Sequence, residues 1–117
     1  MPYPFSTAVR VGDVWELSGQ IGWDSDSNAL VPGGVGPETR QALENIRQVL
    51  EQLGSTMDDV IKVSVFLKTM DDFEVMNQEY GAAFTKGNYP ARSAVAVAGL
   101  ALGASVEIEC SALAAKS

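Results

Sequence analysis

Two periodicities in the hydrophobic pattern divide the chain into expected strands and expected helices. Apolar and polar residues alternate in the strand segments, which are residues 5–11, 14–20, 60–67 and 105–112. Apolar residues recur at helical spacing in the helix segments, which are residues 37–53 and 69–84. A short run of small and β-branched residues at 93–97 adds one more strand. This order predicts a single α+β domain over residues 1–117, with both helices on one face of a mixed sheet.

Glycine and proline residues mark the ends of several elements. Gly12 and Asp13 separate the first two strands and favour a tight turn, so the chain is expected to open with a β-hairpin. Gly19 lies inside the second strand, where glycine indicates a β-bulge or a close approach of the backbone. Pro37 suits the first position of the first helix, and Gly54 suits its end.

The last third of the chain carries an unusual arrangement of charge. Pro90 prevents a helix from continuing, and a glycine-containing turn separates the two strands that follow, so a second β-hairpin is predicted. Alternation on the first of these strands separates Val95 and Val97 from Arg92, Ala94 and Ala96. Alternation on the second separates Val106, Ile108 and Cys110 from Glu107 and Glu109. If the apolar sets line the core, Arg92 and the two glutamates share the opposite face.

This arrangement of Arg92 and carboxylates has two interpretations. A guanidinium held on a strand binds a planar anion through two parallel hydrogen bonds, and a neighbouring carboxylate supplies an acid/base group. The same residues also suit a structural ion pair on a solvated sheet face. The residues alone leave both interpretations open.

The sheet face away from the helices is expected to carry Phe66, Ala94 and Ala96 beside Arg92. Small and apolar side chains are unusual on a face that water covers. We therefore expect a symmetric oligomer to cover this face.

Composition narrows the functions that the chain can have. The formal net charge is −7, with eight Lys and Arg residues and no basic run, so nucleic acid is not an expected partner. The sequence has no histidine and one cysteine, which excludes a histidine-based triad, a Cys/His metal cluster and an internal disulfide. That cysteine, Cys110, is expected to be buried as a small hydrophobic residue. We expect no metal and no cofactor.

No segment has the features of a signal peptide or of a membrane span, so a cytoplasmic protein without a membrane partner is expected.

Several short motifs, in order along nearly the whole chain, resemble one known family. They include Pro-Ala-Arg-Ser at 90–93 followed by Val-Glu-Ile-Glu at 106–109. The others are Ala-Val-Arg-Val-Gly at 8–12, Ser-Gly-Gln-Ile at 18–21, Thr-Arg-Gln-Ala-Leu-Glu-Asn at 39–45 and Met-Asn-Gln-Glu-Tyr at 76–80. Together they resemble the reactive intermediate deaminase family, also called the YjgF-like or Rid family.

The resemblance implies a chorismate-mutase-like fold and a homotrimer whose sheets face inward, with clefts between adjacent subunits. It implies deamination of short-lived enamines and imines, such as 2-aminoacrylate and other 2-imino acids, to 2-keto acids and ammonia. No cofactor is implied, and the expected small-molecule partner is an imino or keto acid.

The resemblance also assigns roles to particular residues. Arg92 is expected to grip the substrate carboxylate, and Glu107 is expected to act as an acid/base group that orients water. The expected substrate-binding residues are Arg92, Phe5, Ser18, Gly19, Asn77 and Ala94. The residues alone leave Asn77 either as a satisfied buried amide or as a site residue.

Phe5 is a departure from the family pattern. The family often has a tyrosine at this position, so Phe5 keeps the ring but removes a hydroxyl, which favours substrates with less polar side chains.

Three alternatives to imine deamination stay open at this point. One is an aminomuconate-type deaminase of aromatic degradation, which needs the same carboxylate-binding arginine. Another is the ribonuclease activity reported for some relatives, which an acidic chain without histidine makes a poor match. The third is a non-catalytic module that binds 2-keto acids.

Overall fold

The computed structural model describes residues 3–115 and contains a five-stranded mixed sheet. From one edge to the other its strands are β1 (Ala8–Val11), β2 (Val14–Ile21), β7 (Val106–Leu113), β5 (Val60–Leu67) and β6 (Ala91–Ala96). All neighbouring strands are antiparallel except β5 and β6, which are parallel. Two further strands, β3 (Trp23–Asp24) and β4 (Ala29–Leu30), pair with each other in a separate small sheet. Single 3-10 turns occupy Met57–Asp59, Met70–Asp72 and Ala101–Gly103.

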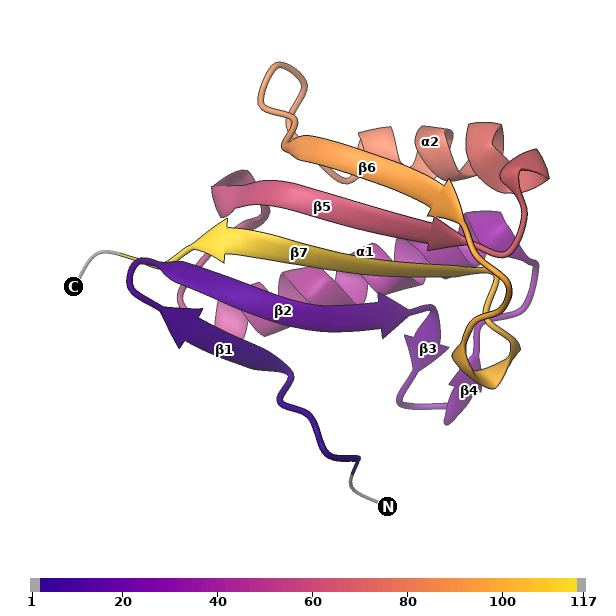
Figure 1. Ribbon diagram of the computed structural model, residues 1–117, viewed down its shortest axis with the longest axis horizontal. Coiled ribbons are helices and arrows are strands. Elements are labelled where there is room, and N and C mark those ends of the chain that lie inside the picture. The colour runs from indigo at the N-terminus through magenta and orange to yellow at the C-terminus, as the bar shows by residue number, and fades with distance from the viewer. Residues whose placement is uncertain (1–2, 116–117) are drawn as a thin grey trace.

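Two helices, α1 (Val35–Gln52) and α2 (Phe73–Ala82), lie behind the sheet on the same face (Figure 1). The core between helices and sheet includes side chains that are at most 1% exposed, namely Ile46, Leu50, Val65, Met76 and Ile108. Burial of such a side chain contributes roughly 1.5–3 kcal/mol, so this interface is the main source of stability. The predicted α+β arrangement of two helices on one face of a mixed sheet is confirmed.

The first helix begins at Val35, earlier than the predicted start at Pro37. Gly33 and Gly34 have φ values of 110° and 85°, a left-handed conformation that favours glycine, and they turn the chain into the helix. Pro37 still lies in the first turn, where its missing N–H has no partner within the helix. Gly54, with a φ of 83°, follows the helix end as predicted.

The opening hairpin and its bulge are confirmed. β1 and β2 pair in register from Val11 opposite Val14 to Ala8 opposite Leu17. The pairing of β2 with β7 shifts register between Leu17 and Gln20, which places the irregularity at Ser18 and Gly19.

The second predicted hairpin is wrong. Strand β6 does not pair with β7, because β5 lies between them and pairs with both (Figure 1). The chain therefore leaves β6, passes the end of β5 through residues 97–105, and returns as β7. That connection is long enough to step over a neighbouring strand, which a two-residue hairpin turn is not.

The face of the sheet opposite the helices is open in the single chain (Figure 1). Exposed apolar side chains lie toward its ends, namely Val9, Val11, Val95 and Leu113. Its centre is polar and holds a hollow of about 120 Å³ lined by Glu16, Leu17, Lys62, Ser64, Glu109, Cys110 and Ser111.

Within residues 3–115, no helix is both long enough and apolar enough to cross a membrane.

Candidate active site

Arg92 lies on the face of the sheet that the helices cover. It pairs in register with Val63, which is 1% exposed, and paired residues of neighbouring strands point to the same side. The expectation that Arg92, Ala94 and Ala96 lie on the open face is therefore wrong, since Ala96 likewise pairs with the buried Leu67. The expectation that Val95 lines the core is wrong as well. Ala94 pairs with the buried Val65 and packs against the core, whereas Val95 is 49% exposed on the open face. The alternation was predicted correctly but its phase was inverted.

Helix α2 holds the guanidinium of Arg92. Its Nη1 donates a hydrogen bond of 2.6 Å to Oδ1 of Asn77 and lies 3.9 Å from the sulfur of Met76. Its central carbon, Cζ, lies 4.8 Å from the centre of the Tyr80 ring and 5.8 Å from that of the Phe73 ring. The guanidinium gains cation–π contacts here, which explains why a charged residue occupies the covered face.

The positive charge of Arg92 has no carboxylate partner in the part of the chain that the structure describes. A neutral amide and two aromatic rings hold the guanidinium without cancelling its charge. Since Nη1 is engaged by Asn77, the edge formed by Nε and Nη2 is the one suited to a planar anion. Among residues 3–115 the structural ion pair considered for Arg92 is not formed.

Glu107 lies on the open face of the sheet, as predicted, beside the bulge of β2. It pairs with Phe66 of β5 and Ile21 of β2, and its neighbours Val106 and Ile108 are fully buried on the other face. A methyl group built on Gly19 would lie 2.0 Å from Oε2 of Glu107. Only glycine therefore leaves room at position 19 for the Glu107 carboxylate as it stands.

Ser18 connects the bulge to the N-terminal segment. Its hydroxyl donates a hydrogen bond of 2.6 Å to the carbonyl of Ser6, and its N–H donates one of 2.9 Å to the carbonyl of Thr7. Phe5 precedes Ser6, is 65% exposed, and has its ring stacked on that of Tyr3 at 6.4 Å between centres. Ser18, Gly19 and Glu107 thus form one group, and Phe5 lies in the segment attached to it.

The predicted site residues therefore form two groups on opposite faces of one sheet. Arg92, Asn77 and Ala94 lie on the helix side of β6, whereas Gly19 and Glu107 lie on the open side of β2 and β7. A single chain does not bring the guanidinium of Arg92 and the carboxylate of Glu107 together.

Two buried titratable groups near these strands are held neutral. Burial raises the pKa of Tyr80 to about 12, although the charge of Arg92 acts in the opposite direction. Burial also raises the pKa of Cys110 to about 12, and Glu16 and Glu109 add to that rise. Cys110 is 5% exposed, so the prediction that it is a buried hydrophobic residue is confirmed and a reactive thiolate is excluded at neutral pH.

Sequence reasoning missed the aromatic surroundings of Arg92 and one buried glutamate elsewhere in the fold. Phe73 and Tyr80 belong to the apolar pattern that predicts a helix over residues 69–84, and that spacing does not reveal that Arg92 lies beneath them. Glu38 was not singled out, yet it is 5% exposed and its Oε1 accepts a hydrogen bond of 2.8 Å from the N–H of Ser105, just before β7.

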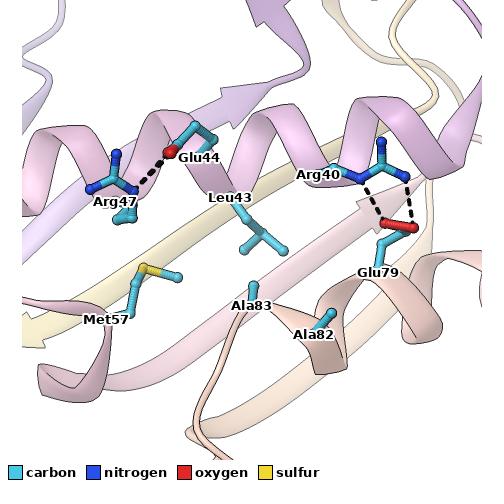
Figure 2. Close-up of a pocket in the computed structure, with 8 residues that line it drawn as sticks. All are labelled: Arg40, Leu43, Glu44, Arg47, Met57, Glu79, Ala82 and Ala83. Carbon is cyan, nitrogen blue, oxygen red and sulfur yellow. Dashed lines mark hydrogen bonds and ion pairs between the residues drawn. The ribbon is translucent and has the colours of Figure 1, made fainter.

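A groove between α1 and α2 lies apart from both groups (Figure 2). It has a volume of about 320 Å³ and is lined by Arg40, Leu43, Glu44, Arg47, Met57, Glu79, Ala82 and Ala83. Arg40 forms two hydrogen bonds to Glu79, at 2.9 and 3.0 Å, and Arg47 forms an ion pair with Glu44 (Figure 2). Each arginine in the groove is thus neutralised by a glutamate, in contrast to Arg92.

Comparison with known proteins assigns the chain to a family. The fold defines a small α+β protein with a mixed sheet covered by two helices on one side, and residues 2–114 match the family model described as Endoribonuclease L-PSP. The chain belongs to this family, which is the YjgF-like or Rid family that its motifs resemble.

Relatives of known sequence cover nearly all of the chain. It is 44% identical over 110 residues to a 2-iminobutanoate/2-iminopropanoate deaminase of Mus musculus, covering 94% of this chain and 81% of that protein. It is 43% identical over 110 residues to the protein of the same name from Homo sapiens, and the alignment covers 94% of this chain and 80% of the human protein.

Solved structures agree with the fold. A putative endoribonuclease L-PSP from Entamoeba histolytica has a TM-score of 0.92 at 35% identity and covers 97% of this chain and 90% of its own. Escherichia coli TdcF, solved with bound serine, has a TM-score of 0.89 at 30% identity, and the match covers 98% of this chain and 91% of TdcF.

Proposed function

We propose that this protein is an imine deaminase that hydrolyses short-lived 2-imino acids to 2-keto acids and ammonia. The observation that carries the proposal is the charge of Arg92, which no carboxylate of residues 3–115 neutralises and which a neutral amide and aromatic rings hold in place. A 2-imino acid has one carboxylate next to its reactive carbon, so a fixed guanidinium determines where that carbon lies. The names of the deaminases in Mus musculus and Homo sapiens support the same substrate class.

The reaction adds water across the C=N bond. The water oxygen bonds to the imine carbon and a proton goes to nitrogen; the C–N bond then breaks, a C=O bond forms, and ammonia leaves. Arg92 binds the substrate carboxylate and screens its charge from the incoming water, while Glu107 accepts a proton from that water and returns it to the leaving nitrogen. Ser18, Gly19, Asn77, Ala94 and Phe5 line the site in this proposal.

The site requires a second copy of the chain, because Arg92 and Glu107 lie on opposite faces of one sheet. We place the reaction in a cleft between adjacent subunits of a homotrimer, where Arg92 and Asn77 of one copy meet Gly19 and Glu107 of the next. The exposed valines and Leu113 on the open face support an interface there, since apolar side chains on that face are otherwise left in water.

Turnover is tested with 2-aminoacrylate generated in situ from serine by a pyridoxal-phosphate dehydratase. The protein should accelerate ammonia release above the spontaneous rate. Binding of pyruvate without any acceleration would instead identify a non-catalytic 2-keto-acid module. Acceleration of RNA cleavage without effect on the imine would support the ribonuclease alternative.

The shared cleft is tested by mixing two inactive variants, Arg92→Met and Glu107→Gln, after unfolding and refolding them together. A cleft with both native residues forms only where the first variant supplies Glu107 and the second supplies Arg92, so about one quarter of the clefts in a random 1:1 mixture regain activity. No recovery in a sample that light scattering shows to be mixed trimers would refute the inter-subunit cleft.

A further inference from the structure

The environment of Arg92 contains more than the amide of Asn77. The rings of Tyr80 and Phe73 both lie within 6 Å of its guanidinium carbon, at 4.8 and 5.8 Å. Phe73, Asn77 and Tyr80 are spaced so that all three lie on the face of α2 that meets the sheet. The helix therefore offers the guanidinium one hydrogen-bond acceptor and two aromatic rings.

Tyr80 makes no use of its hydroxyl in this position. The side chain is 5% exposed, and the hydroxyl oxygen is buried without a hydrogen-bond partner among residues 3–115. An unpartnered buried hydroxyl is unfavourable, so the hydroxyl gives no reason for Tyr80 to lie here. The ring, in contrast, contacts Arg92 at 4.8 Å and the ring of Phe84 at the same distance.

We propose that Tyr80 and Phe73 are positioning residues that hold the guanidinium of Arg92 in the orientation that binds the substrate carboxylate. This inference rests on the proposed function. The rings restrict the guanidinium so that a carboxylate meets its Nε and Nη2 edge, while Asn77 fixes Nη1. Without a ring, the long Arg92 side chain can adopt other orientations. Substrate binding then has to order the side chain again, and this loss of conformational entropy lowers the affinity for the carboxylate.

Two substitutions separate the ring from the hydroxyl at position 80. Tyr80→Phe keeps the ring and removes the unpartnered hydroxyl, so it should retain wild-type KM and kcat. Tyr80→Leu removes the ring, and it should raise KM for the imine and Kd for pyruvate by about tenfold, since a misplaced binding group weakens ligand contacts. Phe73→Leu tests the second ring at a half-buried position, where it should raise both constants by a smaller factor, about threefold.

Phe84→Leu is the matched control for loss of an aromatic ring from the core. Phe84 is 9% exposed and its ring is tilted against that of Tyr80, but the rings that lie over Arg92 are those of Phe73 and Tyr80. This variant should lower the thermal unfolding temperature at least as much as Phe73→Leu and leave Kd for pyruvate unchanged.

Calorimetry of pyruvate binding tests the positioning role of Tyr80 and Phe73 separately from the deaminase proposal, because it measures affinity without turnover. If the wild type binds pyruvate but does not turn over the imine, the deaminase proposal fails, and the rise in Kd in the ring-deleting variants still tests the role of Tyr80 and Phe73. If folded Tyr80→Leu and Phe73→Leu proteins bind pyruvate with wild-type affinity, the positioning role is overturned. It is also overturned if Phe84→Leu weakens binding as much as they do, or if the wild type binds no 2-keto acid at all.

Discussion

Substitution of Gly19 by alanine is the sharpest test of the group around Glu107. A methyl group at this position would lie 2.0 Å from Oε2 of Glu107, and 2.8 and 2.9 Å from Cδ and Cγ. Ordinary van der Waals contact begins at 3.4 Å, so the carboxylate has to move away by more than an ångström. The backbone has no reason to move, because the obstructing atoms belong to the end of a flexible side chain.

The expected consequence is a loss of activity without a loss of stability. Gly19 does not have a positive φ, and replacing such a glycine by alanine stabilises a protein by about 0.4–1 kcal/mol through the unfolded chain. A displacement of about 1 Å in a catalytic group costs about 10²-fold in rate, which corresponds to about 2.7 kcal/mol of transition-state stabilisation. If Gly19→Ala acts by moving Glu107, kcat should fall by this factor while the affinity for pyruvate changes little.

Ammonia release, pyruvate binding and thermal unfolding on one preparation measure all three quantities. Gly81→Ala is the matched control, because it makes the same chemical change in α2, where a methyl group meets nothing within 4 Å. It should raise the unfolding temperature and keep full activity. In the Glu107→Gln background, Gly19→Ala should have no further effect on kcat. Wild-type kcat in Gly19→Ala would refute the acid/base role assigned to Glu107, and a loss confined to pyruvate affinity would instead indicate that Gly19 makes room for the ligand.

Three further predictions concern Arg92, Glu107 and Cys110. Arg92→Lys keeps the charge and loses the planar fork, so the variant should stay folded and lose about 1.5–3 kcal/mol of transition-state binding, measured as kcat/KM; full activity would refute the carboxylate contact. Glu107→Gln should lower kcat by about 10²–10⁴-fold with little change in pyruvate affinity, and unchanged turnover would make Glu107 a structural residue. Burial raises the pKa of Cys110 from 9.0 to about 12, so the folded protein holds the thiol proton more tightly than the unfolded chain. The stability that this shift contributes is complete below about pH 9 and is lost as the pH rises toward 12; denaturant midpoints of Cys110→Ala should fall less steeply in that range, and equal slopes would contradict the assignment.

Local periodicity was sufficient to predict the elements with one strongly buried face. Val106, Ile108 and Cys110 on β7 are buried and Glu107 is on the other side, as the alternation predicted. Such patterns succeed because a strand inside the sheet has to bury one complete face, and a shift by one residue would bury both glutamates.

Strand β6 shows where the same reasoning fails. It lies at the edge of the sheet, and its sequence alternates between Arg92 or alanine and serine or valine, so hydrophobicity does not identify the buried face. Arg92 is accepted on the covered side because α2 places Asn77, Phe73 and Tyr80 against it, and those contacts join segments that are distant in sequence. The insertion of β5 between β6 and β7 is likewise a matter of topology, which the spacing of residues along the chain does not encode.

The position of β6 at the sheet edge also determines how often the strand that carries Arg92 opens locally. An edge strand has hydrogen-bonded neighbours on one side only, so its amide groups exchange with solvent through local opening that does not require global unfolding. Within residues 3–115, β6 pairs only with β5, whereas β7 is held by β2 and β5. The strand that carries Arg92 should therefore open more often than the strand that carries Glu107. Hydrogen exchange along β6 then becomes a direct readout of cleft formation, because a second copy or a bound 2-keto acid that contacts Arg92 slows exchange there first.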